Sequence, residues 1–136
     1  SAAGGSAAGG SAAGGSAAGG SAAGGSAIAA CGATYAGCSA FEDRTNDGAT
    51  VTFDFDTAFG ASKCLRLRST QSLSVTGISS FHPIAQTCGP DRKLEATRNT
   101  AVTFNGLLAG LYGFYCPNHA DSMTGQGMGL ALQIVP

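Results

Sequence analysis

The most constraining feature of this sequence is a series of short runs in which apolar and polar residues alternate. A period of two places every apolar side chain on one face of an extended strand. The apolar positions of these runs are Val51, Phe53 and Phe55; Leu65 and Leu67; Leu73 and Val75; Val102 and Phe104; Tyr112, Phe114 and Cys116; and Met128, Leu130, Leu132 and Ile134. Turn dipeptides, Asp47-Gly48 and Asn105-Gly106, separate some of them. The sequence therefore predicts an all-β protein, an antiparallel sandwich or barrel.

Two parts of the chain depart from this pattern. Residues 85–99 are polar and irregular, which indicates a loop or one short helix. Residues 1–25 are five copies of Ser-Ala-Ala-Gly-Gly, followed by Ser26. These residues are only Ser, Ala and Gly, whose small side chains cannot build a core, and their glycines disfavour a continuous helix. We therefore predict that residues 1–26 form a linker or an assembly arm and that residues 27–136 form one domain.

The charge balance argues against a nucleic-acid partner, and the length of the apolar runs argues against a membrane span. Seven Lys and Arg residues stand against eight Asp and Glu residues, so the chain lacks the excess of basic residues that a nucleic-acid-binding protein needs. No apolar run approaches the length of about 20 residues that crosses a bilayer. The sequence thus predicts a protein without a nucleic-acid partner and without a membrane span.

Residues suited to metal binding lie around one strand and the loop after it. Cys116 lies near the end of its strand, His119 follows it, and a Gly-rich loop, residues 120–127, leads to Met128. Upstream, His82 lies at the end of another strand-like stretch. The chain contains only two histidines and two methionines. Both histidines, one methionine and one cysteine therefore fit a single ligand set.

This donor set points to copper. A thiolate and two imidazoles with a long axial thioether form a type 1 site that accepts both Cu(I) and Cu(II). Taken singly, each residue has an ordinary explanation: Cys-x-x-His also suits zinc or a thiol nucleophile, and a lone His or Met is often a core residue. The prediction of one copper ion rests on their conjunction.

The odd number of cysteines, five, supports this interpretation. With Cys116 as the thiolate, Cys31, Cys38, Cys64 and Cys88 can close two disulfides in three ways. We favour Cys38–Cys64 with Cys31–Cys88, which would attach the N-terminal segment to the domain. Disulfides persist in oxidising compartments, so we predict an extracytoplasmic protein: periplasmic, secreted or at the cell surface. The alternative is five buried thiols in a cytosolic protein.

The same segments carry a family resemblance. Residues 112–119, Tyr-Gly-Phe-Tyr-Cys-Pro-Asn-His, with Gly-Met at residues 127–128 heading the last apolar strand, resemble the copper loop of the cupredoxins, the plastocyanin and azurin family. Residues 63–67 and 81–84 are similar to the half of that site which supplies the first ligand. The resemblance covers residues 49–136. It implies a Greek-key sandwich and one-electron transfer.

Carried over to this chain, the resemblance assigns four metal ligands. His82 is the upstream imidazole, Cys116 the thiolate and His119 the downstream imidazole. Met123 and Met128 both remain candidates for the axial position. Met123 gives a loop length closer to the compact cupredoxins, whereas Met128 has the family's Gly-Met entry into the last strand. We favour Met128, because it shares the inward register of that strand.

One position departs from the family pattern. Pro83 follows the first histidine, where many members have a residue whose N–H binds the copper thiolate, and proline has no N–H. We therefore expect a thiolate with one fewer hydrogen bond and a shifted reduction potential.

The resulting functional prediction is an electron carrier with an unidentified redox partner, not an enzyme. The two histidines are both used as ligands, so no further cluster remains for substrate-reducing copper, and there is no P-loop. An alternative is the subunit of an extracellular filament that polymerises through residues 1–26, with copper for electron relay or structure only. Copper storage ranks last, because such sites are Met-rich.

Overall fold

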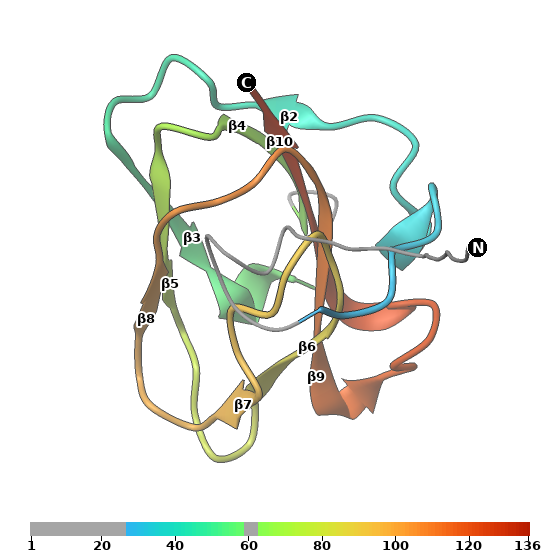
Figure 1. The fold of residues 1–136 in the computed structure, drawn as a ribbon. Coiled ribbons are helices and arrows are strands. Elements are labelled where there is room, and N and C mark those ends of the chain that lie inside the picture. Colours follow the sequence, from blue (N-terminus) through green and yellow to red (C-terminus); the bar gives the residue numbers. More distant parts are fainter. Residues whose placement is uncertain (1–26, 59–62) are drawn as a thin grey trace, which may run out of the picture.

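The described part of the chain, residues 27–58 and 63–136 of the computed structural model, forms two β-sheets and short 3-10 helices (Figure 1). The elements are η3 (Tyr35–Gly37), β2 (Glu42–Asp43), β3 (Thr50–Asp54), η4 (Phe55–Thr57), β4 (Cys64–Arg68), β5 (Ser72–Thr76), β6 (Ile84–Cys88), β7 (Ala96–Thr97), β8 (Val102–Phe104), β9 (Gly110–Ala120) and β10 (Gly127–Val135). The all-β prediction is confirmed. The predicted arm, residues 1–26, lies outside the described residues.

The two sheets are mixed, so the expectation of purely antiparallel sheets is wrong. The larger sheet has the strand order β2-β4-β10-β9-β6-β7, and the smaller has β3-β5-β8. Strands β4 and β10, β2 and β4, and β3 and β5 pair in parallel, whereas the remaining neighbours pair in an antiparallel manner. The alternating pattern could not reveal this, because it specifies the face of each side chain and not the direction of the neighbouring strand.

The predicted apolar faces form the main core between the two sheets. The inward residues of β3, β4, β5, β9 and β10 are almost completely buried and belong to one cluster. The Phe104 ring of β8 stacks on Phe114 of β9, with centroids 4.8 Å apart. This contact joins the smaller sheet to the larger one.

A second, smaller cluster covers the outer face of the larger sheet. It comprises Tyr35, Ala36, Cys38, Cys88 and Ala131. Disulfides join Cys31 to Cys88 and Cys38 to Cys64, which confirms the predicted pairing. The N-terminal segment is thus attached covalently to β6 and β4.

Close packing of this segment requires glycine at position 113 of β9. A Cβ atom there would lie 2.8 Å from Cε2 of Tyr35 and 2.5 Å from Sγ of Cys88. Both distances are too short for a real side chain, so Gly113 lets the N-terminal segment rest directly on the sheet.

Residues 85–99 contain strands β6 and β7 rather than only a loop or a helix, so that prediction is wrong. Strand β6 shows no alternation of burial, because both its faces are covered. Its buried polar residue, Gln86, is fully used: Oε1 accepts hydrogen bonds from the N–H groups of Lys93 and Leu94, and Nε2 donates to the Asp91 carbonyl. These bonds let a polar side chain occupy a buried strand.

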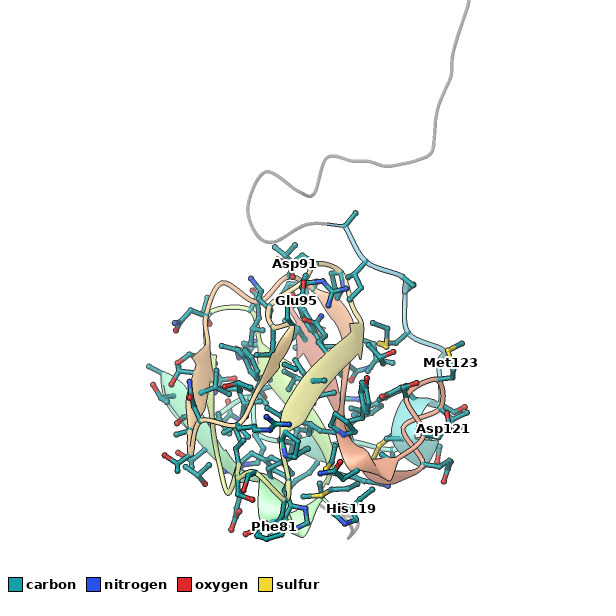
Figure 2. The ribbon with its side chains drawn as sticks, turned by 90° about the horizontal axis from the view of Figure 1, so that it is seen from below. Phe81, Asp91, Glu95, His119, Asp121 and Met123 are labelled. Carbon is teal, nitrogen blue, oxygen red and sulfur yellow. A yellow bond between two sulfur atoms is a disulfide. The ribbon has the colours of Figure 1, made fainter. Side chains whose placement is uncertain are left out.

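A buried polar cluster lies at the end of the molecule opposite the candidate site. The Tyr112 hydroxyl donates to Oδ1 of Asp91 at 2.5 Å, and Nζ of Lys93 lies 3.0 Å from Oδ2. Figure 2 shows Asp91 at one end and Phe81 and His119 at the other.

Among the described residues, no helix has the length and apolarity required to cross a membrane.

Candidate metal centre

A wide bulge in β9 creates the downstream half of the site. Gly127 of β10 pairs with Ala120, and Gly129 pairs with Tyr115. Four residues of β9, from Cys116 to His119, therefore lie opposite one residue of β10, Met128. A bulge of this kind re-aims side chains that a regular strand would alternate between its faces. It allows Cys116 to remain in the core while His119 reaches the end of the sheet.

A tight turn before β6 positions the upstream histidine. Oγ of Ser79 accepts hydrogen bonds from the backbone N–H groups of Phe81 and His82, at 3.2 and 3.1 Å. The Ser79 N–H in turn donates to the His82 carbonyl at 3.2 Å. Pro83 follows and is buried at the start of β6. The backbone of His82 is thus fixed on both sides.

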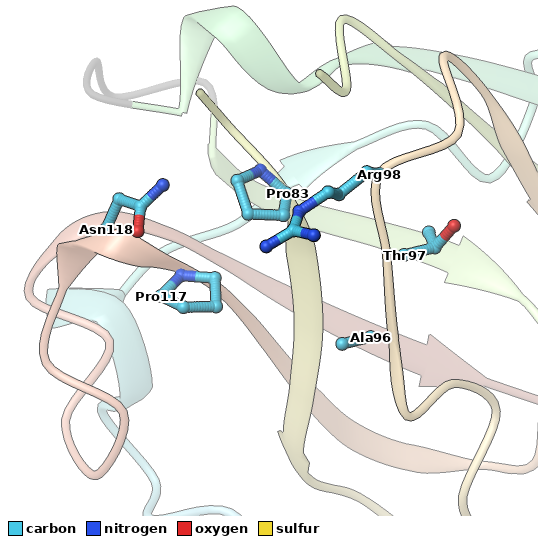
Figure 3. A pocket seen from close by; sticks show the side chains of 6 residues that line it. All are labelled: Pro83, Ala96, Thr97, Arg98, Pro117 and Asn118. Carbon is cyan, nitrogen blue, oxygen red and sulfur yellow. The ribbon is translucent and has the colours of Figure 1, made fainter. Parts of the chain in front are cut away.

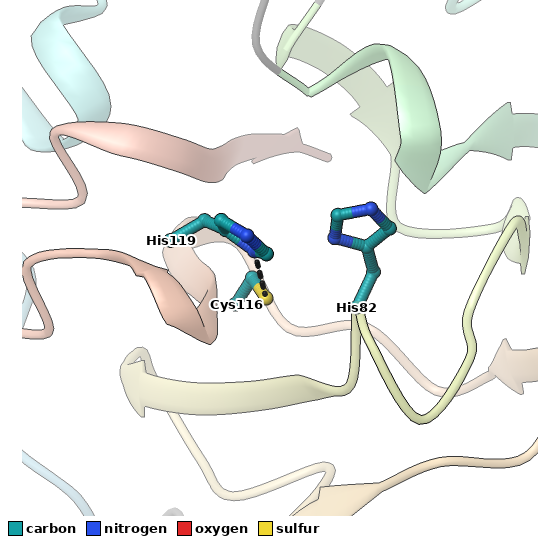
Figure 4. Close-up of side chains that lie close together, drawn as sticks. All are labelled: His82, Cys116 and His119. Atoms are coloured by element: carbon teal, nitrogen blue, oxygen red, sulfur yellow. Dashed lines mark hydrogen bonds between the residues drawn. The ribbon is translucent and has the colours of Figure 1, made fainter.

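The structure brings His82, Cys116 and His119 together (Figure 4). One possible ligand atom from each residue can be chosen so that all three lie within 4.8 Å of one another. Sγ of Cys116 is 3.5 Å from Nδ1 of His119, and the two imidazole centroids are 4.8 Å apart. Cys116 is buried and is the free cysteine of the described chain.

These distances fit a metal ion. Two imidazole nitrogens and one thiolate at about 2.0–2.3 Å from an ion in their plane lie roughly 3.5–3.7 Å from one another. The Cys116–His119 pair already has this spacing. The remaining edges, at most 4.8 Å, need a closure of about 1 Å, which the partly exposed His82 side chain can supply. The group could therefore hold a metal ion.

The two histidines differ in their exposure to solvent. Nδ1 of His82 is buried, whereas its Nε2 faces outward, 3.9 Å from Oδ1 of Asp56. His119 is exposed and lies at the surface next to Phe81, whose side chain is 76% exposed (Figure 2). The site therefore has a buried sulfur, one partly exposed imidazole and one exposed imidazole.

The two methionines lie in different environments. Met128 is fully buried, belongs to the same core cluster as Cys116 and lies opposite the bulge. Met123 is 82% exposed, at the side of the molecule near Asp121 (Figure 2). Asp121 fixes this loop, because its Oδ1 accepts hydrogen bonds from the N–H groups of Thr124 and Met123, which hold the pKa of that carboxyl below its usual range. Burial beside the bulge favours Met128 as the fourth ligand.

Three groups near the site were not predicted from the sequence. The backbone oxygen of Phe81 lies 3.8 Å from Sγ of Cys116 and accepts a hydrogen bond from Nδ2 of Asn118 at 3.1 Å. Asp56 faces His82. Phe81 and Asn118 each precede a predicted ligand in the sequence, and this adjacency could have pointed to them. Asp56 is brought in by η4, and only the fold could place it.

Comparison of the chain with protein-family models, with curated proteins and with solved structures finds no match.

Proposed function

We propose that this protein is an extracytoplasmic, cupredoxin-like carrier of single electrons. One copper ion would be held by Cys116, His82 and His119, with Met128 as the fourth ligand. The observation that carries the proposal is the convergence of a buried thiol and two imidazoles at one end of an all-β domain. The Greek-key topology of that family belongs to the proposal as well.

The donor set suits copper better than other metals. Sulfur ligands stabilise Cu(I) and imidazoles stabilise Cu(II), and copper bound to both would supply a reversible one-electron couple. A structural zinc site would normally have four Cys and His ligands. The described chain offers three such residues here, together with a thioether.

The protein surroundings favour small structural change between oxidation states. The backbone of His82 is fixed by the Ser79 turn, and Cys116 belongs to the main core cluster. Donors held by the fold cannot rearrange freely, which keeps the geometry similar in both states. The exposed His119 offers a route for an electron to leave the buried centre.

Two further observations support the proposed extracytoplasmic location and the proposed role as an electron carrier. The two disulfides favour an oxidising compartment outside the cytoplasm. Both histidines of the whole chain lie in the cluster, so a second histidine-rich copper site for substrate reduction has no ligands. An electron carrier without enzymatic activity is the function that we propose.

Voltammetry of the copper-loaded protein tests this function. We expect a reversible one-electron wave that persists over repeated cycles, because the donors suit both oxidation states. His82→Gln, which keeps a polar side chain of similar size, should bind copper more weakly and give an irreversible wave. Oxidation of the Cys116 thiol by Cu(II), with loss of the ion after one cycle, would refute the proposal.

A further inference from the structure

A second feature, a pocket of about 500 Å³, opens beside the candidate metal centre (Figure 3). Its lining residues are Pro83, Ala96, Thr97, Arg98, Pro117 and Asn118. Pro83 directly follows His82 in the chain, and Pro117 and Asn118 separate Cys116 from His119. A molecule in this pocket would contact the neighbours of all three donor residues without displacing any of them.

The pocket has one charged group. Ile84 of β6 pairs with Thr97 of β7 in antiparallel register, which places Arg98 across from Pro83. Figure 3 shows the Arg98 guanidinium reaching from the β7 side toward Pro83 and Pro117. Arg44 and Arg92 each face a carboxylate, whereas Arg98 makes no ion pair with any residue of the described chain. Among the described residues that line the pocket, none is a carboxylate and Arg98 is the one charged residue.

The other lining residues are of two kinds: Pro83, Ala96 and Pro117 are apolar, and Thr97 and Asn118 are polar. The exposed Pro117 ring and the exposed methyl group of Ala96 offer apolar contact, and Pro83 forms part of the wall behind them. Pro83 is buried, and the Asn118 side chain is held by its hydrogen bond to the Phe81 carbonyl. Pockets that bind small molecules typically combine apolar walls with a few oriented polar groups. A pocket that is already formed needs little ordering when its ligand binds.

We propose that this pocket binds a small aromatic carboxylate. The planar guanidinium of Arg98 matches the two oxygens of a carboxylate and can donate to both. The exposed Pro117 ring provides an apolar surface for an aromatic ring, and the volume accommodates a single ring with its substituent. The pocket is distinct from the proposed copper ligands, so its occupancy does not depend on the metal.

Titration of the full-length chain with benzoate, followed by NMR chemical shifts, tests this proposal. We expect saturable shifts around Pro83, Ala96 and Arg98 with a dissociation constant of about 1 mM, a strength appropriate to so small a ligand. Benzyl alcohol has the same ring without the charge and should bind about tenfold more weakly, as should acetate, which has the charge without the ring.

Substitution of the arginine provides the decisive comparison. Arg98→Gln should weaken benzoate binding about tenfold, and Arg98→Lys should weaken it less, because the charge remains but the planar fork is lost. Arg68→Gln is the matched control: Arg68 is likewise exposed and, among the described residues, makes no ion pair, but it lies on β4. Equal benzoate binding by wild type and Arg98→Gln would overturn the proposal, as would equal binding of benzoate and benzyl alcohol.

The test separates this inference from the proposed electron transfer. It is performed without added copper, so an absence of benzoate binding leaves the copper proposal intact. Conversely, benzoate binding by a chain that fails to bind copper would support the pocket alone.

Discussion

The side-chain amide of Asn118 donates a hydrogen bond to the backbone oxygen of Phe81, 3.1 Å away. This bond joins the bulge of β9, which contains Cys116 and His119, to the turn that positions His82. The same Phe81 oxygen lies 3.8 Å from Sγ of Cys116. The two halves of the candidate metal centre, which are far apart in the sequence, are therefore connected by a direct polar contact.

Replacement of Asn118 by Ala should lower copper affinity about tenfold, because supporting groups around metal ligands typically contribute this much. The free energy of unfolding should change by about 1 kcal/mol or less, since the residue is exposed. Competition with a chelator of known affinity measures the first quantity, and urea denaturation measures the second. Asn99→Ala, at another exposed asparagine, is the control. Equal copper affinities of the two variants would show that the Asn118 bond does not support the site.

The choice between the two methionines can be tested by a pair of identical substitutions. Met128→Leu should shift the visible absorption and the reduction potential of the copper protein, because it removes the proposed axial thioether. It should cost less than about 1.5 kcal/mol of unfolding free energy, since the two side chains have similar volumes. Met123→Leu should change neither spectrum nor potential, because Met123 is 82% exposed. The reverse result would assign the axial position to Met123.

Pro83 should keep the reduction potential of the copper protein lower than that of a variant with a backbone N–H at this position. Among the residues that the structure describes, the polar contacts of Sγ of Cys116 are the Phe81 oxygen and Nδ1 of His119, and none is a backbone N–H. Pro83→Ala supplies an N–H at that position. A hydrogen bond of about 1 kcal/mol to the thiolate would raise the potential by about 40 mV. Voltammetry measures the change, and an unaltered potential would show that the missing N–H does not tune the site.

Two buried tyrosines should respond in opposite directions to the loss of their hydroxyl groups. The Tyr112 hydroxyl donates to Asp91 and accepts from the Leu108 N–H, so Tyr112→Phe should lower the unfolding free energy by about 1–3 kcal/mol. Within the described chain the buried Tyr35 hydroxyl has no hydrogen-bond partner, so Tyr35→Phe should raise the free energy by about 1 kcal/mol. Thermal or urea denaturation measures both changes. Destabilisation by Tyr35→Phe would reveal an unrecognised partner for that hydroxyl.

The raised pKa values of these two tyrosines also predict how the stability of the protein changes at alkaline pH. Burial, and then the hydrogen bond to Asp91, raise the pKa of Tyr112, and burial is also the main cause of the raised pKa of Tyr35. A raised pKa in the folded state stabilises the protein below the pKa of the unfolded chain, about 10, and this contribution is lost as the pH rises above it. The midpoint of thermal or urea denaturation should therefore decrease when the pH is raised above about 10. Tyr112→Phe should show a smaller fall, and an identical pH profile would contradict this assignment.

Much of the candidate site could be predicted because its residues are rare in this chain. With two histidines and one cysteine left after two disulfides, few combinations remained, and the structure brings His82, Cys116 and His119 together. The position of Asp56 could not be predicted, because it depends on how η4 packs beside the Ser79 turn. The role of the Phe81 oxygen was also hidden, because backbone groups carry no signal in a sequence.

For the fold, the sequence predicted features that depend on neighbouring residues, but not features that depend on contacts between distant parts of the chain. Alternation predicted the buried face of β3, β4, β5, β9 and β10, since this property depends on neighbouring residues alone. It failed for β6, where the N-terminal segment covers the outer face and hides the period of two. The parallel pairing of β4 with β10, residues that are far apart in the chain, has no local signal either.

The most direct test of the proposed copper centre is the absorption spectrum recorded while Cu(II) is added to the metal-free protein. We expect an intense visible band that saturates at one copper ion per chain, because in the proposed site the Cys116 thiolate would bond directly to copper. Cys116→Ser, which replaces sulfur by oxygen at nearly the same size, should bind copper without this band. A colourless wild-type protein, or an identical spectrum for Cys116→Ser, would contradict the assignment of Cys116, His82 and His119 as a type 1 copper site.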